Sequence, residues 1–512
     1  MRRLILWWSL AGTGTVFLVL TAVLAHQIQP GPLRDRIVTA LSHRLNAEVT
    51  IEHLEMALLP RPRVTGAGLV IRVRHRDDLP PFITLERFSM DVGLLSITRH
   101  HVDTIHVDGL RINVPPVEAR QTLGRDRDAE PEGFLSPSKV IVEHMISHDA
   151  ELAFVSTRAN KHPLVFAIRD LELDQLGFDR AVPFHAILMN PVPTGLVDTR
   201  GSFGPLDKDD PAESPVKGQY VFTNANLSTI DRIQGTLSST GTFDGRISAI
   251  DANGTTRTPD FNLGLGGHPV SLDTTFSALI DGSSGTVTLR KVDATIQHTS
   301  LVVTGAVTNM PGPAHHSIDL DVVVKQGRIE DFLTLLSAKP PMARGNLALH
   351  TRVYLPPGNR PVLSRIVLTG QFGLASTTFQ KEFQAKIQEL SRRSQGKGKN
   401  DPAEAVASNV RGTFALANGL LKVPAVSFEV PGALVRLDGS SDLKARTLSL
   451  TGTLQMEASV SKAVGGFKSI FLKVADPFFR KNGAGALVPI KITGTFDALQ
   501  VGLNLRAGKG KN

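Results

Sequence analysis

Paired histidines are the groupings in this sequence that come closest to a metal or catalytic site. His144 and His148 have the spacing at which two imidazoles on one helix bind zinc, but Glu143 precedes His144 and the H-E-x-x-H order is absent. The surrounding residues alternate as in a strand, so we interpret both histidines as structural. Neighbouring side chains in a strand point apart, and the adjacent histidine pairs at 100–101 and 315–316 therefore predict no metal site either.

Other reactive groupings are weaker still. The chain has no cysteine, which excludes disulfides, thiolate metal sites and cysteine nucleophiles. The glycines within 264–267 are followed by neither a helical pattern nor a lysine, so they predict no phosphate-binding loop. A G-x-S-x-G elbow and a Walker motif are both absent from the sequence. We therefore predict a protein that is not an enzyme, with no catalytic residue, no metal and no cofactor.

The charge balance allows two kinds of partner, and the aromatic residues choose between them. A net charge of +8 suits either nucleic acid or an anionic membrane surface. Nucleic-acid grooves interleave basic residues with stacking aromatics. Here both tryptophans, Trp7 and Trp8, lie near the start, and almost every other aromatic residue is phenylalanine. Phenylalanine suits an apolar core or an apolar ligand, so we predict no nucleic-acid partner.

An uncharged segment near the start predicts a membrane anchor. Leu4 to Ala25 would form about 33 Å of helix at about 1.5 Å per residue, which matches a hydrocarbon core of about 30 Å. Arg2 and Arg3 precede it and favour a cytoplasmic N-terminus. The alternative is a signal peptide cleaved after Ala25, and both interpretations export the remainder of the chain. We expect residues 1–29 to form a cytoplasmic tip and a single transmembrane helix in the inner membrane.

The segment behind the anchor changes from a helical to a strand pattern. Leu33, Ile37, Leu41 and Leu45 recur at helical spacing and predict a short amphipathic helix. From Val49 onward, apolar and polar residues alternate with period two, which is typical of antiparallel strands with one dry and one wet face. We therefore expect a mainly β protein in which the transmembrane helix is followed by an elongated, twisted antiparallel β-groove with a few short helices.

The clearest alternating runs supply the residues expected to line that groove. They are Leu272, Phe276, Ile280, Ile318, Leu320, Val322, Val324, Leu347, Leu349 and Val353. A Gly-x-Phe motif also recurs without a fixed period, at residues 201–203, 241–243, 370–372, 412–414 and 494–496. Glycine within a strand marks a bend or a close backbone approach, so the motif predicts a strongly curved sheet.

One helical pattern near the end has two interpretations. Phe467, Phe471 and Phe478 share much of one helical face, and Lys468 and Lys473 lie beside it. A helix of this kind either caps the groove or contacts an anionic membrane leaflet.

Several of these features together resemble the AsmA family. The resemblance begins with the anchor and continues through VDTIHVDGLRI at 102–112 and ISHDAELAF at 146–154. In the last third it lies in QELSRR at 388–393, FALANG at 414–419, FEVPGA at 428–433, DPFF at 476–479 and PIKITGT at 489–495. The sequence accordingly divides into an AsmA-like N-terminal β region at 30–160, a middle β-groove region at 161–360 and an AsmA-like C-terminal region at 361–512. The last region includes a helix and a basic linker near 377–404.

The resemblance implies a location and a ligand. AsmA proteins, like the architecturally related TamB-like and YhdP-like proteins, are anchored in the inner membrane with their bulk in the periplasm. It implies that this chain binds or conducts phospholipid or another acyl-chain lipid, supporting outer-membrane biogenesis and envelope integrity. The alternative is an envelope scaffold or assembly factor that contacts outer-membrane or other envelope proteins without moving lipid.

Overall fold

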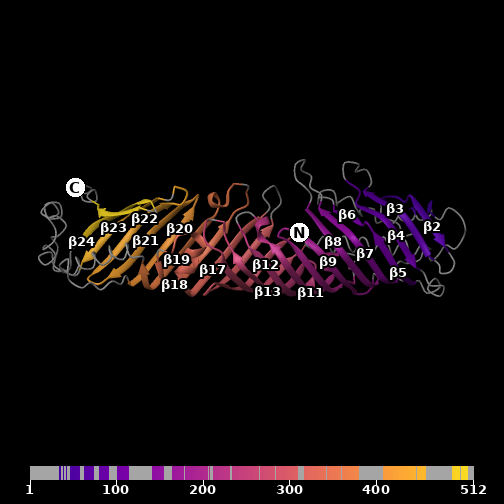
Figure 1. The fold of residues 1–512 in the computed structure, drawn as a ribbon, viewed down its shortest axis with the longest axis horizontal. Coiled ribbons are helices and arrows are strands. Elements are labelled where there is room, and N and C mark those ends of the chain that lie inside the picture. The colour runs from indigo at the N-terminus through magenta and orange to yellow at the C-terminus, as the bar shows by residue number, and fades with distance from the viewer. Residues whose placement is uncertain are drawn as a thin grey trace. The chain divides into compact units, whose positions relative to one another are not determined.

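The fold is taken from a computed structural model. It describes residues 34–35, 38–39, 42, 47–57, 63–73, 80–91, 101–114, 141–154, 164–177, 179–205, 207, 211–230, 233–264, 266–282, 284–309, 316–341, 343–358, 360–379, 408–445, 447–456, 487–495 and 498–504. This part of the chain is mainly β, as the alternating pattern predicts, and it falls into two compact units (Figure 1). The predicted transmembrane helix lies outside the described residues, and none of the helices within them has the length and apolar character to cross a membrane.

The first unit comprises residues 1–258 and 276–287. Its strands are β1 (Ala47–Thr50), β2 (His53–Ala57), β3 (Arg63–Val73), β4 (Ile83–Asp91), β5 (His101–Asp108), β6 (Arg111–Val114), β7 (Ile141–Phe154), β8 (Leu164–Leu176), β9 (Val182–Pro191), β10 (Thr194–Phe203), β11 (Pro215–Asn226), β12 (Thr236–Arg246) and β13 (Ala249–Phe261). Two short 3-10 helices, η2 (Pro211–Glu213) and η3 (Leu227–Thr229), flank β11. Of the predicted amphipathic helix, the described residues are helical, and Val38 packs against the core.

Most strands of this unit are antiparallel neighbours, with one departure. β1 and β2 both pair with β3, and from β7 to β13 each strand pairs with the next in antiparallel fashion. β5 and β6, however, pair with β7 in parallel and with β4 in antiparallel orientation. The predicted antiparallel pairing is therefore confirmed for the other strand pairs of this unit, and these two parallel pairs depart from it. A parallel neighbour needs a long connection, and residues 115–140 provide one between β6 and β7.

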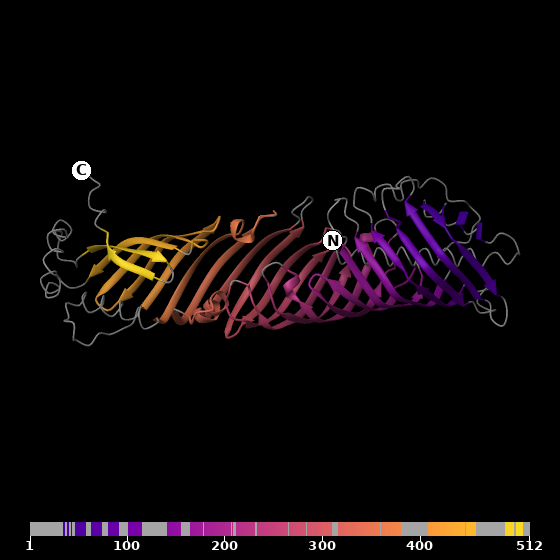
Figure 2. The same cartoon turned by 45° about the horizontal axis from the view of Figure 1, so that its top comes forward.

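The second unit comprises residues 259–275 and 288–512. Its strands are β16 (Thr299–Asn309), β17 (His316–Arg328), β18 (Ala343–Leu355), β19 (Val367–Phe379), β20 (Ser408–Ala417), β21 (Leu420–Val430), β22 (Ala433–Asp442), β23 (Thr447–Met456), β24 (Leu487–Thr495) and β25 (Ala498–Leu503). Helix α5 (Ile329–Leu336) follows β17, and the 3-10 helix η4 (Val362–Ser364) precedes β19. From β16 to β25 each strand pairs with its successor in antiparallel fashion, and Figure 2 shows these strands side by side. Strands β14 (Val270–Asp281) and β15 (Thr286–Ile296) contribute residues to both units, and the last three residues of β13 likewise belong to the second unit.

The recurring Gly-x-Phe motif has a structural explanation in the strand register. In β19 and β20, Gly370 lies opposite Phe414 and Phe372 lies opposite Gly412, so the two motifs face each other in reverse order. A methyl group on Gly370 would lie 2.9 Å from Phe414 Cζ, which shows that the ring covers the glycine backbone. The same reciprocal arrangement joins the motif at 241–243 in β12 to Gly218-Gln219-Tyr220 in β11. The glycines therefore make room for aromatic rings on the neighbouring strand.

Candidate functional site

The apolar side of β17 and β18 brings together most of the residues expected to line a groove. Leu320 lies opposite Val353, and Val324 lies opposite Leu349, so the predicted residues of the two strands share one face. The neighbouring strand β16 adds Val303 to this face, opposite Val322. We refer to the side of the strands that carries these residues as the inner face.

This inner face is only partly shielded from solvent. Val324 is 1% exposed and Leu347 is 4% exposed. The other predicted residues of β17 and β18 are half-buried, and these are Ile318, Leu320, Val322, Leu349 and Val353. Apolar side chains that retain solvent contact add binding capacity for a hydrocarbon ligand, because covering them releases about 25 cal/mol per Å² of apolar area.

Helix α5 covers one part of the inner face in the second unit. Leu335 belongs to a buried cluster with Val270 and Val324, and Phe332 packs against the same cluster. Leu272, Val322 and Leu349 also contact this cluster but remain half-buried. The face therefore changes from buried beneath α5 to partly exposed farther along the strands.

A buried carboxylate fixes the first turn of α5. Asp331 is 3% exposed, and its Oδ2 atom accepts hydrogen bonds from Thr299 Oγ1 at 2.7 Å and from the His298 amide at 3.2 Å. The other end of the helix is held by His268, whose amide donates to the Thr334 carbonyl at 2.9 Å. A carboxylate in the first helical turn also interacts favourably with the helix dipole.

The remaining predicted residues lie on β14, which is divided between the units. Leu272 belongs to the second unit, whereas Phe276 and Ile280 belong to the first. Ile280 packs against the core of the first unit. Phe276 lies over Gly254, because a methyl group on that glycine would be 2.9 Å from the ring. The predicted capping or membrane-contact residues, Phe467, Lys468, Phe471, Lys473 and Phe478, lie outside the described residues.

In the first unit we likewise call the side that carries its buried cluster the inner face, and this side holds hydroxyl groups that the sequence analysis did not single out. Thr199 of β10 lies opposite Tyr220 of β11, and Ser239 of β12 lies opposite Thr256 of β13. Tyr220 Oη and Ser239 Oγ are 3.0 Å apart, which connects the two pairs. Polar residues at alternate positions of neighbouring strands are the signal that would have identified this group.

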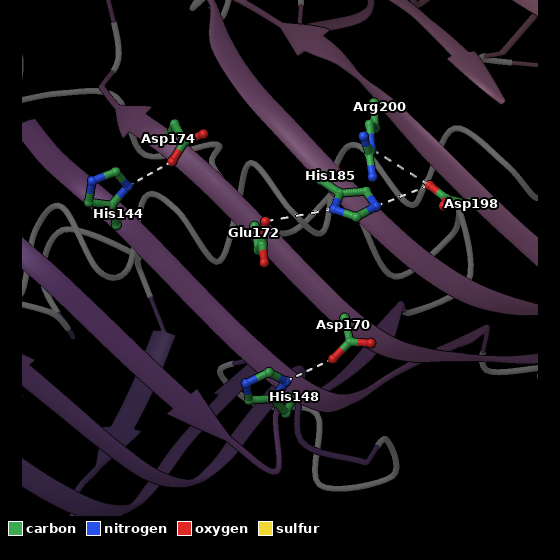
Figure 3. A network of polar contacts seen from close by, with 8 residues as sticks. All are labelled: His144, His148, Asp170, Glu172, Asp174, His185, Asp198 and Arg200. Atoms are coloured by element: carbon green, nitrogen blue, oxygen red, sulfur yellow. Dashed lines mark hydrogen bonds and ion pairs between the residues drawn. The ribbon is translucent and has the colours of Figure 1, made fainter.

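His144 and His148, whose spacing was considered for a metal site, lie on the opposite, outer face of the first unit. Figure 3 shows His144 Nδ1 2.8 Å from Asp174 and His148 Nδ1 2.9 Å from Asp170, each across the β7–β8 pair. His185 on β9 contacts Asp198 at 3.0 Å in the same way. Each histidine thus pairs with a carboxylate on an adjacent strand. Among the described residues, no group of three or more potential ligands could hold a metal ion.

Charge pairs of a different kind lie on the outer face of the second unit. Arg352 of β18 donates two hydrogen bonds to Asp319 of β17, at 2.9 and 2.7 Å. These hydrogen bonds lower the pKa of the Asp319 carboxyl and raise that of the Arg352 guanidinium. Because both side chains are exposed, the pair adds little to the stability of the fold.

Comparisons with protein families, with characterised proteins and with solved structures find no match to this chain. The resemblance to the AsmA family therefore remains a prediction from the sequence.

Proposed function

We propose that this protein binds or conducts phospholipid, or another lipid with acyl chains, along the apolar inner face of its strands. The observation that carries the proposal is the half-buried state of Leu320, Val322 and Leu349 in the second unit. These side chains share one face of the neighbouring strands β17 and β18. They keep solvent contact that an ordinary core would remove. Such a face can take up a hydrocarbon chain whose exposure to water would otherwise cost about 0.8 kcal/mol per methylene.

The proposed location follows from the sequence. An uncharged segment at residues 4–25, preceded by Arg2 and Arg3, would anchor the chain in the inner membrane and place the strands in the periplasm. We further propose that the strands form an elongated β-groove and that the protein supports outer-membrane biogenesis, as the resemblance to AsmA proteins implies. A protein in that compartment would need no catalytic group to perform this task.

The test compares two aspartate substitutions at adjacent positions of β17. Val322→Asp places a charge on the inner face, whereas Val323→Asp places one on the outer face, opposite His350. Both variants would be purified as full chains in detergent, and the lipids that accompany them would be extracted and identified by mass spectrometry. We expect wild-type protein and Val323→Asp to retain phospholipid, and Val322→Asp to lose most of it.

Two outcomes would contradict this proposal. One is equal lipid content in the two variants, which would place lipid elsewhere than on the inner face. The other is wild-type protein that carries a stoichiometric protein partner and no lipid, which would favour the envelope scaffold. Val322 also contacts the buried cluster beneath α5, so its substitution could disturb the fold. Circular dichroism of both variants therefore serves as the control that separates loss of lipid from loss of fold.

A further inference from the structure

The inner face of the first unit changes its chemistry between β9 and β10. From β1 to β9, the buried polar side chains among the described residues are those of Ser147 and Asn190, and the rest of this face is apolar. From β10 to β13, hydroxyl-bearing side chains occupy neighbouring positions on four successive strands. They are Thr199, Tyr220, Ser239 and Thr256, and we call them the hydroxyl row.

The register makes this row continuous. Thr199 is paired with Tyr220, and Ser239 is paired with Thr256. Tyr220 itself lies opposite Gly241, two residues beyond Ser239 on the same face of β12. A methyl group on Gly241 would lie 2.8 Å from Tyr220 Cε1, so the phenol ring lies across the glycine and its hydroxyl reaches Ser239.

The centre of the row holds more hydrogen-bonding capacity than it uses internally. Tyr220 and Ser239 each carry one O–H group, and the contact between them at 3.0 Å engages only one of the two hydrogens. Ser239 is buried and Tyr220 is half-buried, and the contact between their hydroxyls leaves one of the two O–H groups available to a ligand. Thr258, two residues beyond Thr256 on β13, is 1% exposed, and its Oγ1 atom has no hydrogen-bond partner among the described residues.

Resting on the proposed lipid-binding function, we propose that Tyr220 and Ser239 bind the ester carbonyl groups that join acyl chains to the glycerol of a lipid. An ester carbonyl is an uncharged acceptor, and it lies next to hydrocarbon that the half-buried Leu237 and Phe243, on the same face of β12, could cover. The row contains no lysine or arginine, which a phosphate group would need for tight binding. The hydroxyl row would thus hold the polar end of the acyl chains at β11 and β12.

The experiment uses a diacyl phosphatidylethanolamine and its dialkyl ether analogue with the same chains and headgroup. An ether oxygen is a weaker acceptor than an ester carbonyl, so only the ester lipid benefits from the free donor. Competition between the two lipids for the full chain would be measured by native mass spectrometry. We expect wild-type protein to prefer the ester lipid about fivefold, the value of one ordinary hydrogen bond, and the double variant Tyr220→Phe/Ser239→Ala, which lacks both hydroxyls, to bind the two lipids equally.

A matched control removes a hydroxyl from the other face of the same strand. Thr240 follows Ser239 on β12, and its Oγ1 atom lies 3.3 Å from that of Thr255 on the exposed outer face. Thr240→Val should keep the preference for the ester lipid. Equal binding of both lipids by wild-type protein, or a preference that survives in Tyr220→Phe/Ser239→Ala, would overturn this proposal but leave lipid binding standing. If neither lipid binds, the proposed function fails as well.

Discussion

The inner faces of β3–β9 and of β16–β24 derive from the same alternating pattern but end in different states. On β9, inner residues such as Phe184 and Leu188 are buried, and they join one cluster that extends back to β1. On β21, the corresponding residues are mostly half-buried, and the second unit has two smaller clusters instead of one. Alternation therefore determines which side of a strand faces inward, whereas residues far away in the sequence determine whether that side is sealed.

The largest expected effect tests the sealed side of this comparison. Leu69 on β3 is fully buried in the core of the first unit, whereas Leu349 on β18 is half-buried. We expect Leu69→Ala to lower the free energy of unfolding by about 2–5 kcal/mol, because it leaves a cavity. Leu349→Ala should cost about 1 kcal/mol, since it removes apolar area that is only partly covered. Urea denaturation monitored by hydrogen exchange in each unit would measure the loss of unfolding free energy in both variants. Equal losses would contradict the distinction between a sealed and a partly exposed face.

The next effect concerns the buried cluster beneath α5 in the second unit. Asp331→Ala removes the acceptor for Thr299 Oγ1 and for the His298 amide. We expect this change to cost about 1.5–3 kcal/mol, because the two donors lose their buried carboxylate acceptor. Hydrogen exchange of residues 329–336 would report release of α5. Asp331→Asn keeps an acceptor oxygen in place and should retain most of the protection; if it exchanges as fast as the alanine variant, the hydrogen bonds do not hold the helix.

The third prediction concerns a position at which the partly exposed strands are nevertheless tightly packed. Gly370→Ala would bring a methyl group to 2.5 Å from the His350 carbonyl oxygen and 2.9 Å from Phe414 Cζ. Gly373, on the same strand, would place its methyl group no nearer than 4.0 Å from the Val410 carbonyl oxygen. We expect Gly370→Ala to cost about 1–3 kcal/mol. Gly373→Ala should be neutral or stabilising by a few tenths of a kcal/mol, because it restricts the unfolded chain. Thermal unfolding of the pair measures the difference, and similar melting temperatures would mean that Phe414 moves aside at little cost.

The sequence allowed the mainly β class and the inward-facing residues of β14, β17 and β18 to be predicted, because alternation is a local property of each strand. Whether neighbouring strands run parallel is not local. The parallel pairs of β7 with β5 and β6 arise from the long connection after Val114, which the alternating pattern does not report. Burial is equally non-local, since Val324 is sealed by a helix and its near neighbour Leu320 is not.

The hydroxyl row was missed for a related reason. Thr199, Tyr220 and Ser239 are separated by about 20 residues each, and threonine and serine at single inward positions look like ordinary strand residues. Only the register aligns them across neighbouring strands. The Gly-x-Phe motif shows that a pattern can also be visible in the sequence while its structural cause is not. Its recurrence is visible in the sequence, but the ring-over-glycine contact that explains it requires two motifs to meet in reverse order.

The smallest expected effect concerns the exposed charge pairs on the outer face, which should add little to the stability of either unit. Hydrogen bonds from Arg352 hold the pKa of Asp319 below its ordinary value. A carboxyl group whose pKa is lower in the folded than in the unfolded state stabilises the fold above the unfolded pKa, and this contribution disappears as the pH falls through the folded pKa. Asp319→Asn should therefore reduce stability slightly at neutral pH, and the difference from wild type should shrink as the pH falls below about 3.9, the ordinary pKa of an aspartate side chain. Urea denaturation across this range, repeated at high salt, measures the effect, which screening should weaken because both side chains are exposed. A difference that grows in acid would mean that Asp319 acts through something other than its pairing with Arg352.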